Sequence, residues 1–108
     1  MNIQALTSRT EEVSKLLKVV ANSQRLRILC ELNNGERSVS ALEAVVPLSQ
    51  SALSQHLGKL RKLGIVTTRR EAQSIYYSLA DPRVADLMTT LYKLFCAPPK
   101  SRMRRTAK

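Results

Sequence analysis

Three side chains in this sequence of 108 residues are suited to chemistry: the thiols of Cys30 and Cys96 and the imidazole of His56. A thiolate can attack an electrophile or form a disulfide, and a neighbouring imidazole can activate it as a base. The sequence contains no Cys-x-x-Cys motif, and nothing in it orients His56 as a base. We therefore expect no enzymatic activity and no catalytic residues.

The two cysteines have two interpretations. A free cysteine is a small apolar side chain that is often buried and inert, and Cys30 shares a predicted helix face with Leu26 and Leu29. Alternatively the two thiols sense oxidants, because in a reducing compartment a pair of cysteines is seldom a structural disulfide. Spacing alone favours the inert pair.

A metal site is not expected. Zinc sites use three or four cysteine, histidine or carboxylate ligands. No cysteine or carboxylate stands three or four residues after His56, which is the only histidine. Packing at the flank of a helix, or a contact with a phosphate, accounts for His56, so we expect neither a metal nor another cofactor.

The segment LSQSALSQHL, residues 48–57, predicts a helix with two different sides. Leu53, Leu57 and Leu60 fall within about 60° of one another on a helical wheel, which predicts a buried edge. The other side carries short polar groups and then basic ones, with no acidic residue between residues 44 and 70. Such groups can approach base edges and phosphates of DNA, whereas an ordinary solvated face usually mixes acids with bases. The expected DNA-contacting residues of this helix are Gln50, Ser51, Ser54, Gln55 and Arg61.

Apolar periodicity predicts a mainly α chain with a small β-hairpin wing, that is, a winged helix-turn-helix of five helices and two strands. We expect this domain at residues 10–97, a flexible N-terminal tail at residues 1–9 and a basic disordered tail at residues 98–108. Ser40 is a possible cap of the third helix, and Ser49 is the expected cap of the fourth. The helices are expected near residues 10–21, 23–32, 39–46, 49–63 and 82–97, and the strands near residues 65–70 and 75–79.

The formal net charge of +10 favours a polyanionic partner, either nucleic acid or an anionic membrane surface. No apolar run approaches the roughly 20 residues of a membrane span, and residues 1–15 lack the pattern of a signal peptide. We therefore expect a cytoplasmic protein without membrane association. Five of the eighteen basic residues lie in the last nine positions, which form either a solvated tail or a non-specific phosphate contact.

Residues 13–96 resemble the ArsR/SmtB family of bacterial winged-helix repressors. The resemblance is carried by RLRIL, by SQSALSQHLGKLRKLGIV and by RREAQSIYYSL. It implies a homodimer built on the first and last helices, which binds a palindromic operator in double-stranded DNA with half-sites about 34 to 36 Å apart, or a multiple of that. It also implies that Gln50, Ser51, Ser54 and Gln55 contact bases, and that Arg69, Arg70 and Gln73 of the wing meet the flanking backbone or minor groove.

The sequence departs from the metal-sensing members of this family, because the positions of their usual ligands keep only Glu43 and Asp86. The contexts RILCEL and KLFC are instead similar to the dithiol branch, which responds to persulfides or oxidants. This resemblance implies that Cys30 and Cys96 are oxidised or bridged by sulfur, that operator affinity then falls, and that sulfide-detoxification genes are expressed. A regulator with inert cysteines and a non-specific nucleoid protein are the alternatives.

Overall fold

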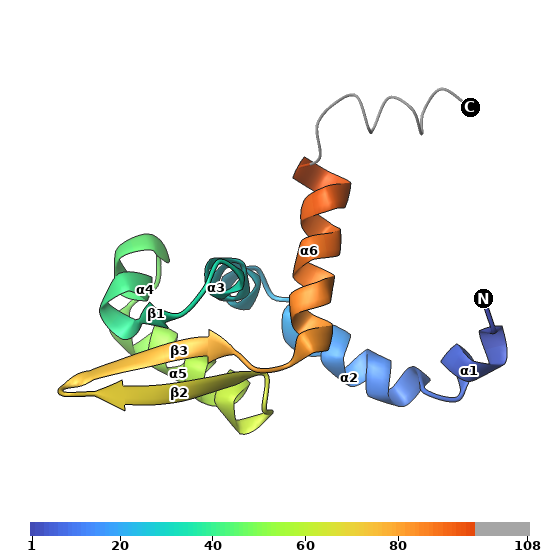
Figure 1. Ribbon diagram of the computed structural model, residues 1–108, viewed down its shortest axis with the longest axis horizontal. Coiled ribbons are helices and arrows are strands. Elements are labelled where there is room, and N and C mark those ends of the chain that lie inside the picture. Colours follow the sequence, from blue (N-terminus) through green and yellow to red (C-terminus); the bar gives the residue numbers. More distant parts are fainter. Residues whose placement is uncertain (97–108) are drawn as a thin grey trace.

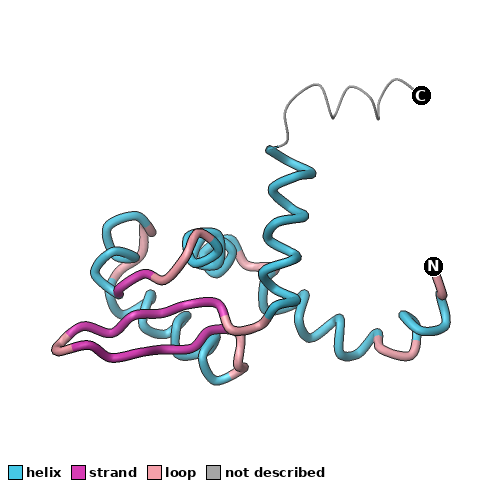
Figure 2. The backbone as a smooth tube through the Cα atoms, in the orientation of Figure 1, coloured by secondary structure: helices cyan, strands magenta, loops and turns pink. Residues whose placement is uncertain are grey.

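The computed structural model describes residues 1–96, so residue 97 and the predicted basic tail lie outside the described residues. Figure 2 shows that these residues are mainly helical, with the strands confined to one small sheet. The elements, in chain order, are α1 (Ile3–Thr7), α2 (Thr10–Val20), α3 (Ser23–Asn33), β1 (Arg37–Ser38), α4 (Val39–Val45), α5 (Gln50–Lys62), β2 (Val66–Glu71), β3 (Ser74–Leu79) and α6 (Pro82–Cys96).

The helix-turn-helix consists of α4 and α5, and side-chain caps fix where both helices begin. The Ser49 hydroxyl accepts a hydrogen bond from the backbone N–H of Ala52 at 3.1 Å, as predicted. The hydroxyl that caps α4 belongs to Ser38, which accepts from the N–H of Ala41 at 3.0 Å. The prediction of Ser40 as this cap is wrong, because Ser38 has the extended conformation of a cap while Ser40 already lies inside the helix.

The three strands form one antiparallel sheet in the order β1-β3-β2. Strands β2 and β3 form the hairpin that we call the wing, in which Glu71 pairs with Ser74 at the turn. Ala72 in this turn has a φ of +56°. The sequence did not predict β1, because its two residues are too few for an alternating pattern.

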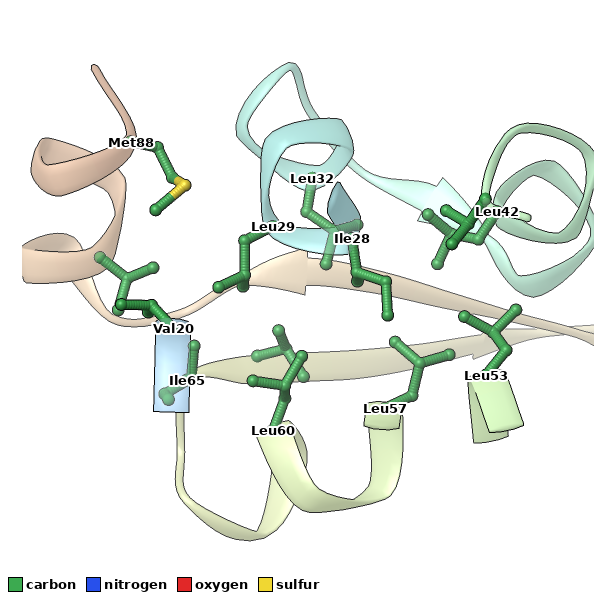
Figure 3. Packing of buried hydrophobic residues seen from close by; sticks show 13 residues of the cluster. Val20, Ile28, Leu29, Leu32, Leu42, Leu53, Leu57, Leu60, Ile65 and Met88 are labelled. Atoms are coloured by element: carbon green, nitrogen blue, oxygen red, sulfur yellow. The ribbon is translucent and has the colours of Figure 1, made fainter. Parts of the chain in front are cut away.

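The hydrophobic core lies between α5, α3 and the sheet. In Figure 3 Leu57 and Leu60 point from α5 toward Ile28 and Leu29 of α3, and Met88 approaches from α6. Ile28, Leu29 and Leu60 have no exposed surface. The leucine edge predicted for α5 is therefore the edge that seats this helix in the domain.

The N-terminal residues differ from the prediction. A flexible tail was expected at residues 1–9, but Ile3–Thr7 form α1, which begins where the Asn2 side chain accepts from the N–H of Ala5 at 3.2 Å. No residue of α1 is buried. One helical turn without a packed face gives no apolar periodicity, which is why the sequence pattern did not indicate it.

The elements are arranged so that the wing and the terminal helices lie at opposite ends of the molecule. Figure 1 shows the tip of the wing pointing away from α2 and α6, with α3, α4 and α5 between them. No helix of residues 1–96 combines the length and the apolar character needed to cross a membrane. Observed and predicted bounds of α2, α3 and α5 agree to within about two residues.

Candidate nucleic-acid interface and thiol pair

The outer side of α5 carries a continuous polar surface, which we call the recognition face and define as Gln50, Ser51, Ser54 and Gln55. All four side chains are exposed, whereas the leucines on the other side of α5 are buried. Arg61, also exposed, lies near the end of the same helix. All five residues that the sequence predicted on this helix are therefore exposed on α5.

A groove of about 310 Å³ separates α5 from the wing. Ser54 lines it from the recognition face, and Gln73, Ile75 and Tyr77 line it from the wing. Ser38 and Ser40 border the same groove near the start of α4. One member of the recognition face, Ser54, and the wing therefore border the same groove.

The two arginines of the wing have different surroundings. Arg69 donates to both carboxylate oxygens of Glu36, at 3.0 and 2.8 Å, and its guanidinium lies 4.6 Å from the ring centre of Tyr76. A third bond joins it to Glu71 at 3.0 Å. Arg70 is exposed, and within residues 1–96 no carboxylate forms an ion pair with it.

The contact with Arg69 changes the pKa of the Glu36 carboxyl. The hydrogen bonds from Arg69 lower the pKa of the Glu36 carboxyl, and the positive charge of Arg69 lowers it further, although desolvation acts in the opposite direction. Glu36 was not among the predicted site residues. Sequence alone gives no signal for its role, because its partner stands 33 positions away and depends on strand pairing.

His56 is half-buried at the side of α5. Burial lowers the pKa of its imidazole, and the nearby positive charges of Arg25 and Lys59 lower it further. The neutral form is therefore favoured. In the described part of the chain, no three histidine, cysteine or carboxylate side chains come together in a way that could hold a metal ion.

The cysteines lie on two neighbouring helices. Cys30 on α3 lines a cavity of about 440 Å³ together with Met88, Thr89 and Tyr92 of α6. Cys96 follows Thr89 by two helical turns, so both residues project from the same side of α6. Both thiols are free and exposed, so the interpretation of Cys30 as a buried apolar side chain is wrong.

Cys30 is nevertheless a weaker acid than an ordinary thiol. Partial burial raises its pKa, and the charges of Glu31 and Cys96 raise it further. The smallest of these contributions comes from Cys96 on the neighbouring helix α6. Asn33, Asn34 and Tyr92, which line the same cavity, were not predicted, because they carry no motif and meet only when α3 and α6 pack.

This chain is similar in sequence to known bacterial regulatory proteins. The model of the family "Bacterial regulatory protein, arsR family" matches residues 22–68. A biofilm growth-associated repressor of Agrobacterium fabrum is 48% identical over 99 residues, which cover 92% of this chain and 85% of the repressor.

Solved structures of bacterial regulators share both sequence and fold with this chain. The transcriptional repressor BigR from Xylella fastidiosa is 42% identical with a TM-score of 0.85, and the match covers 91% of this chain and all of that one (100%). Reduced HlyU from Vibrio cholerae is 44% identical with a TM-score of 0.80, over 86% of this chain and 98% of that one. The fold class predicted from the sequence, a winged helix-turn-helix, is confirmed by this likeness.

Proposed function

Because the chain belongs to the arsR family of bacterial regulatory proteins, we propose that it is a sequence-specific DNA-binding repressor of transcription that releases its operator when Cys30 and Cys96 are oxidised. The observation that carries the DNA-binding part is the groove shared by the recognition face and the wing. The observation that carries the sensing part is the placement of two free, exposed thiols on the packed helices α3 and α6.

In this proposal α5 enters the major groove, which is about 12 Å wide and accepts a helix. Serine and glutamine side chains of the recognition face can both donate and accept hydrogen bonds, so they can discriminate base edges. Arg61 follows them at the end of the helix and meets a phosphate. Arg70 and Gln73 of the wing meet the flanking backbone or the minor groove.

We propose that the repressor is a homodimer formed through the first and last long helices. Apolar side chains remain exposed on both: Leu17 on α2 is 46% exposed and Tyr92 on α6 is 63% exposed. Both helices lie at the end of the molecule opposite the wing tip (Figure 1). A second copy can therefore cover them while both recognition faces stay open to a palindromic operator.

The oxidation step needs an acceptor for two electrons. With a low-molecular-weight persulfide, one thiolate attacks the outer sulfur and releases the thiol of the reagent, which leaves a persulfide on the protein. The second thiolate then attacks the inner sulfur of that group. The products are a disulfide between Cys30 and Cys96 and one molecule of hydrogen sulfide. A second persulfide that transfers its outer sulfur to this bridge and leaves as the thiol gives a trisulfide.

A bridge between these cysteines joins α3, which packs in the core of the DNA-binding part, to α6, which is proposed to form the dimer. It can therefore change the relative orientation of the two recognition faces in the dimer. For regulation the two redox states must differ in DNA affinity, and each tenfold difference corresponds to about 1.4 kcal/mol.

The experiment compares reduced protein with protein treated with glutathione persulfide. Wild-type protein first selects a duplex from a random-sequence pool, and its affinity for that duplex is measured in both states. We expect weaker binding after treatment, with an intact mass that shows a disulfide or added bridging sulfur. Cys30→Ser and Cys96→Ser should bind equally before and after treatment. Equal affinity of the two wild-type states would contradict the sensing proposal.

Net charge supports one competing function, a non-specific nucleoid protein. Such a protein binds all duplexes with similar affinity, whereas a repressor prefers its own site by roughly 10³ or more. The same selection experiment separates them, because a non-specific protein enriches no sequence. A third outcome, specific binding that does not respond to persulfide, would indicate a regulator with inert cysteines.

A further inference from the structure

We propose that Arg69 positions the wing through an ion pair with Glu36 and makes no contact with DNA, so that Arg70 is the phosphate-binding arginine of the wing. This inference rests on the proposed DNA-binding function. Arg69 and Arg70 are adjacent in the chain, and the family resemblance implied the same role for both.

Three of the five N–H donors of Arg69 are engaged within the chain. Its Nε donates to Oε2 of Glu36 at 3.0 Å and its Nη2 donates to Oε1 of the same carboxylate at 2.8 Å. Its Nη1 donates to Oε1 of Glu71 at 3.0 Å. The Tyr76 ring covers one side of the guanidinium. Two carboxylates therefore compete with a phosphate for this side chain, whereas Arg70 has no such ion pair within residues 1–96.

The register of the hairpin places the two arginines on opposite faces. Arg69 pairs with Tyr76 and Arg70 pairs with Ile75, and neighbouring residues of a strand point to opposite sides. Ile75 lines the groove shared with the recognition face. Arg70 therefore shares its face of the sheet with that groove, while Arg69 projects from the other face.

The ion pair of Glu36 with Arg69 also links β1 and β2, two strands that are not hydrogen-bonded to each other. Glu36 immediately precedes β1, Arg69 lies on β2, and β3 runs between these strands. The pair thus spans the middle strand above Tyr76 and ties the two outer strands together. Because β1 continues directly into α4, the pair fixes the wing relative to the helix-turn-helix.

A fixed wing matters for binding because Arg70 and Gln73 must reach the duplex while α5 occupies the major groove of the DNA. When the wing is free to move, part of the binding free energy is spent on ordering it. Arg69 is accordingly a positioning residue, and loss of either partner of the pair should weaken binding without removing a phosphate contact.

The test compares Arg69→Gln, Glu36→Gln and the double variant with Arg70→Gln, using a duplex selected by the wild type and a duplex of arbitrary sequence. We expect Arg69→Gln and Glu36→Gln each to bind the selected duplex roughly tenfold more weakly, and the double variant to bind no more weakly than either single variant. The fall for Glu36→Gln is diagnostic, because removal of a negative charge near DNA should by itself tighten binding.

The salt dependence supplies a readout that a purely structural effect leaves unchanged. Arg70→Gln should lower the slope of log affinity against log salt by about one on both duplexes, whereas Arg69→Gln should keep the wild-type slope. Arg69→Lys should resemble Arg69→Gln, because a lysine keeps the charge but cannot form the two parallel bonds to Glu36. A slope lowered equally by Arg69→Gln and Arg70→Gln would overturn the inference.

Amide hydrogen exchange in the absence of DNA tests the ion pair independently of the proposed function. Glu36→Gln should increase exchange in residues 66–79 and leave the amides of α5 unchanged. Unchanged exchange in the wing would contradict the positioning role. If the wild type selects no duplex, the proposed function fails, and this measurement still decides whether the pair fixes the wing.

Discussion

Arg83 at the start of α6 donates to Glu12 of α2, with 2.8 Å between Nη1 and Oε2. The same guanidinium donates through Nη2 to Oδ2 of Asp81, also at 2.8 Å. Asp81 in turn accepts a hydrogen bond from the backbone N–H of Arg83 at 2.9 Å, as a helix cap does. One arginine thus ties α2 to α6, the two helices proposed to form the dimer.

Asp81→Ala should lower the free energy of unfolding by about 1 kcal/mol at neutral pH, because it removes this cap. The hydrogen bonds from Arg83 hold the pKa of Asp81 below its ordinary value of 3.8. The carboxylate is therefore favoured in the folded state, and its stabilisation is present above that value and is lost as pH falls through the lower folded pKa. Urea denaturation at several acidic pH values measures the difference in unfolding free energy between the wild type and Asp81→Ala. A difference that does not change with pH would contradict this role of Asp81.

Leu57→Ala should destabilise the fold by about 2 to 5 kcal/mol. Leu57 is 2% exposed and packs between α5 and α3, so truncation leaves a cavity beneath the recognition face. The measurement is again the free energy of unfolding in urea. Leu63→Ala is the matched control, because Leu63 is 52% exposed at the end of the same helix and its truncation should change stability by no more than about 0.5 kcal/mol.

Ala72→Gly should stabilise the wing. The φ of +56° at Ala72 is a left-handed conformation that glycine adopts without the steric cost of a Cβ. Glycine also increases the entropy of the unfolded chain, which cancels part of this benefit. We therefore expect a net gain of about 0.5 kcal/mol in unfolding free energy. Ala72→Val is the opposing control, since a β-branched side chain fits this conformation poorly and should lower stability. Equal stability of the two variants would show that the turn is not strained.

Alkylation of Cys30 should be slow at neutral pH, because burial raises the pKa of this thiol above the ordinary thiol pKa of 9.0. The midpoint of the rate increase with pH should therefore lie above pH 9.0. Cys96 also raises the pKa of Cys30. Cys96→Ser should therefore make Cys30 react faster at a fixed pH, whereas loss of a general base would make it react more slowly. Mass-resolved iodoacetamide labelling over a pH series distinguishes these results, with Cys30→Ser as the control for labelling at Cys96.

Long amphipathic elements could be predicted from the sequence, and contacts between elements could not. The leucines at positions 53, 57 and 60 indicate the buried edge of α5, because a helix of 13 residues repeats its apolar pattern several times. Strand β1 and helix α1 are too short to repeat a pattern. Sequence-local rules identified Ser49 as a cap but misplaced the cap of α4 by two residues.

In the candidate site, too, features within one helix could be predicted from the sequence, and contacts between elements could not. The recognition face depends on the spacing within one helix, so its four members were predicted together. The pair of Glu36 with Arg69 depends on the order of three strands, and the cavity at Cys30 depends on how α6 packs against α3. Neither arrangement has a signal in the local sequence, which is why Arg69 and Arg70 could not be told apart before the register was known.

Substitution of the recognition face should change sequence preference more than overall affinity. Gln50→Ala and Ser54→Ala each remove side-chain hydrogen bonds to base edges, and each should reduce discrimination at one position of the half-site by about 1 to 3 kcal/mol. Their salt slopes should stay at the wild-type value, because no phosphate contact is lost. Arg61→Gln is the control, since it should weaken binding to every duplex and lower the slope by about one. The measurement is a selection from a random pool repeated with each variant, followed by titrations at several salt concentrations. Retention of the wild-type preference by both alanine variants would remove α5 as the element that specifies sequence.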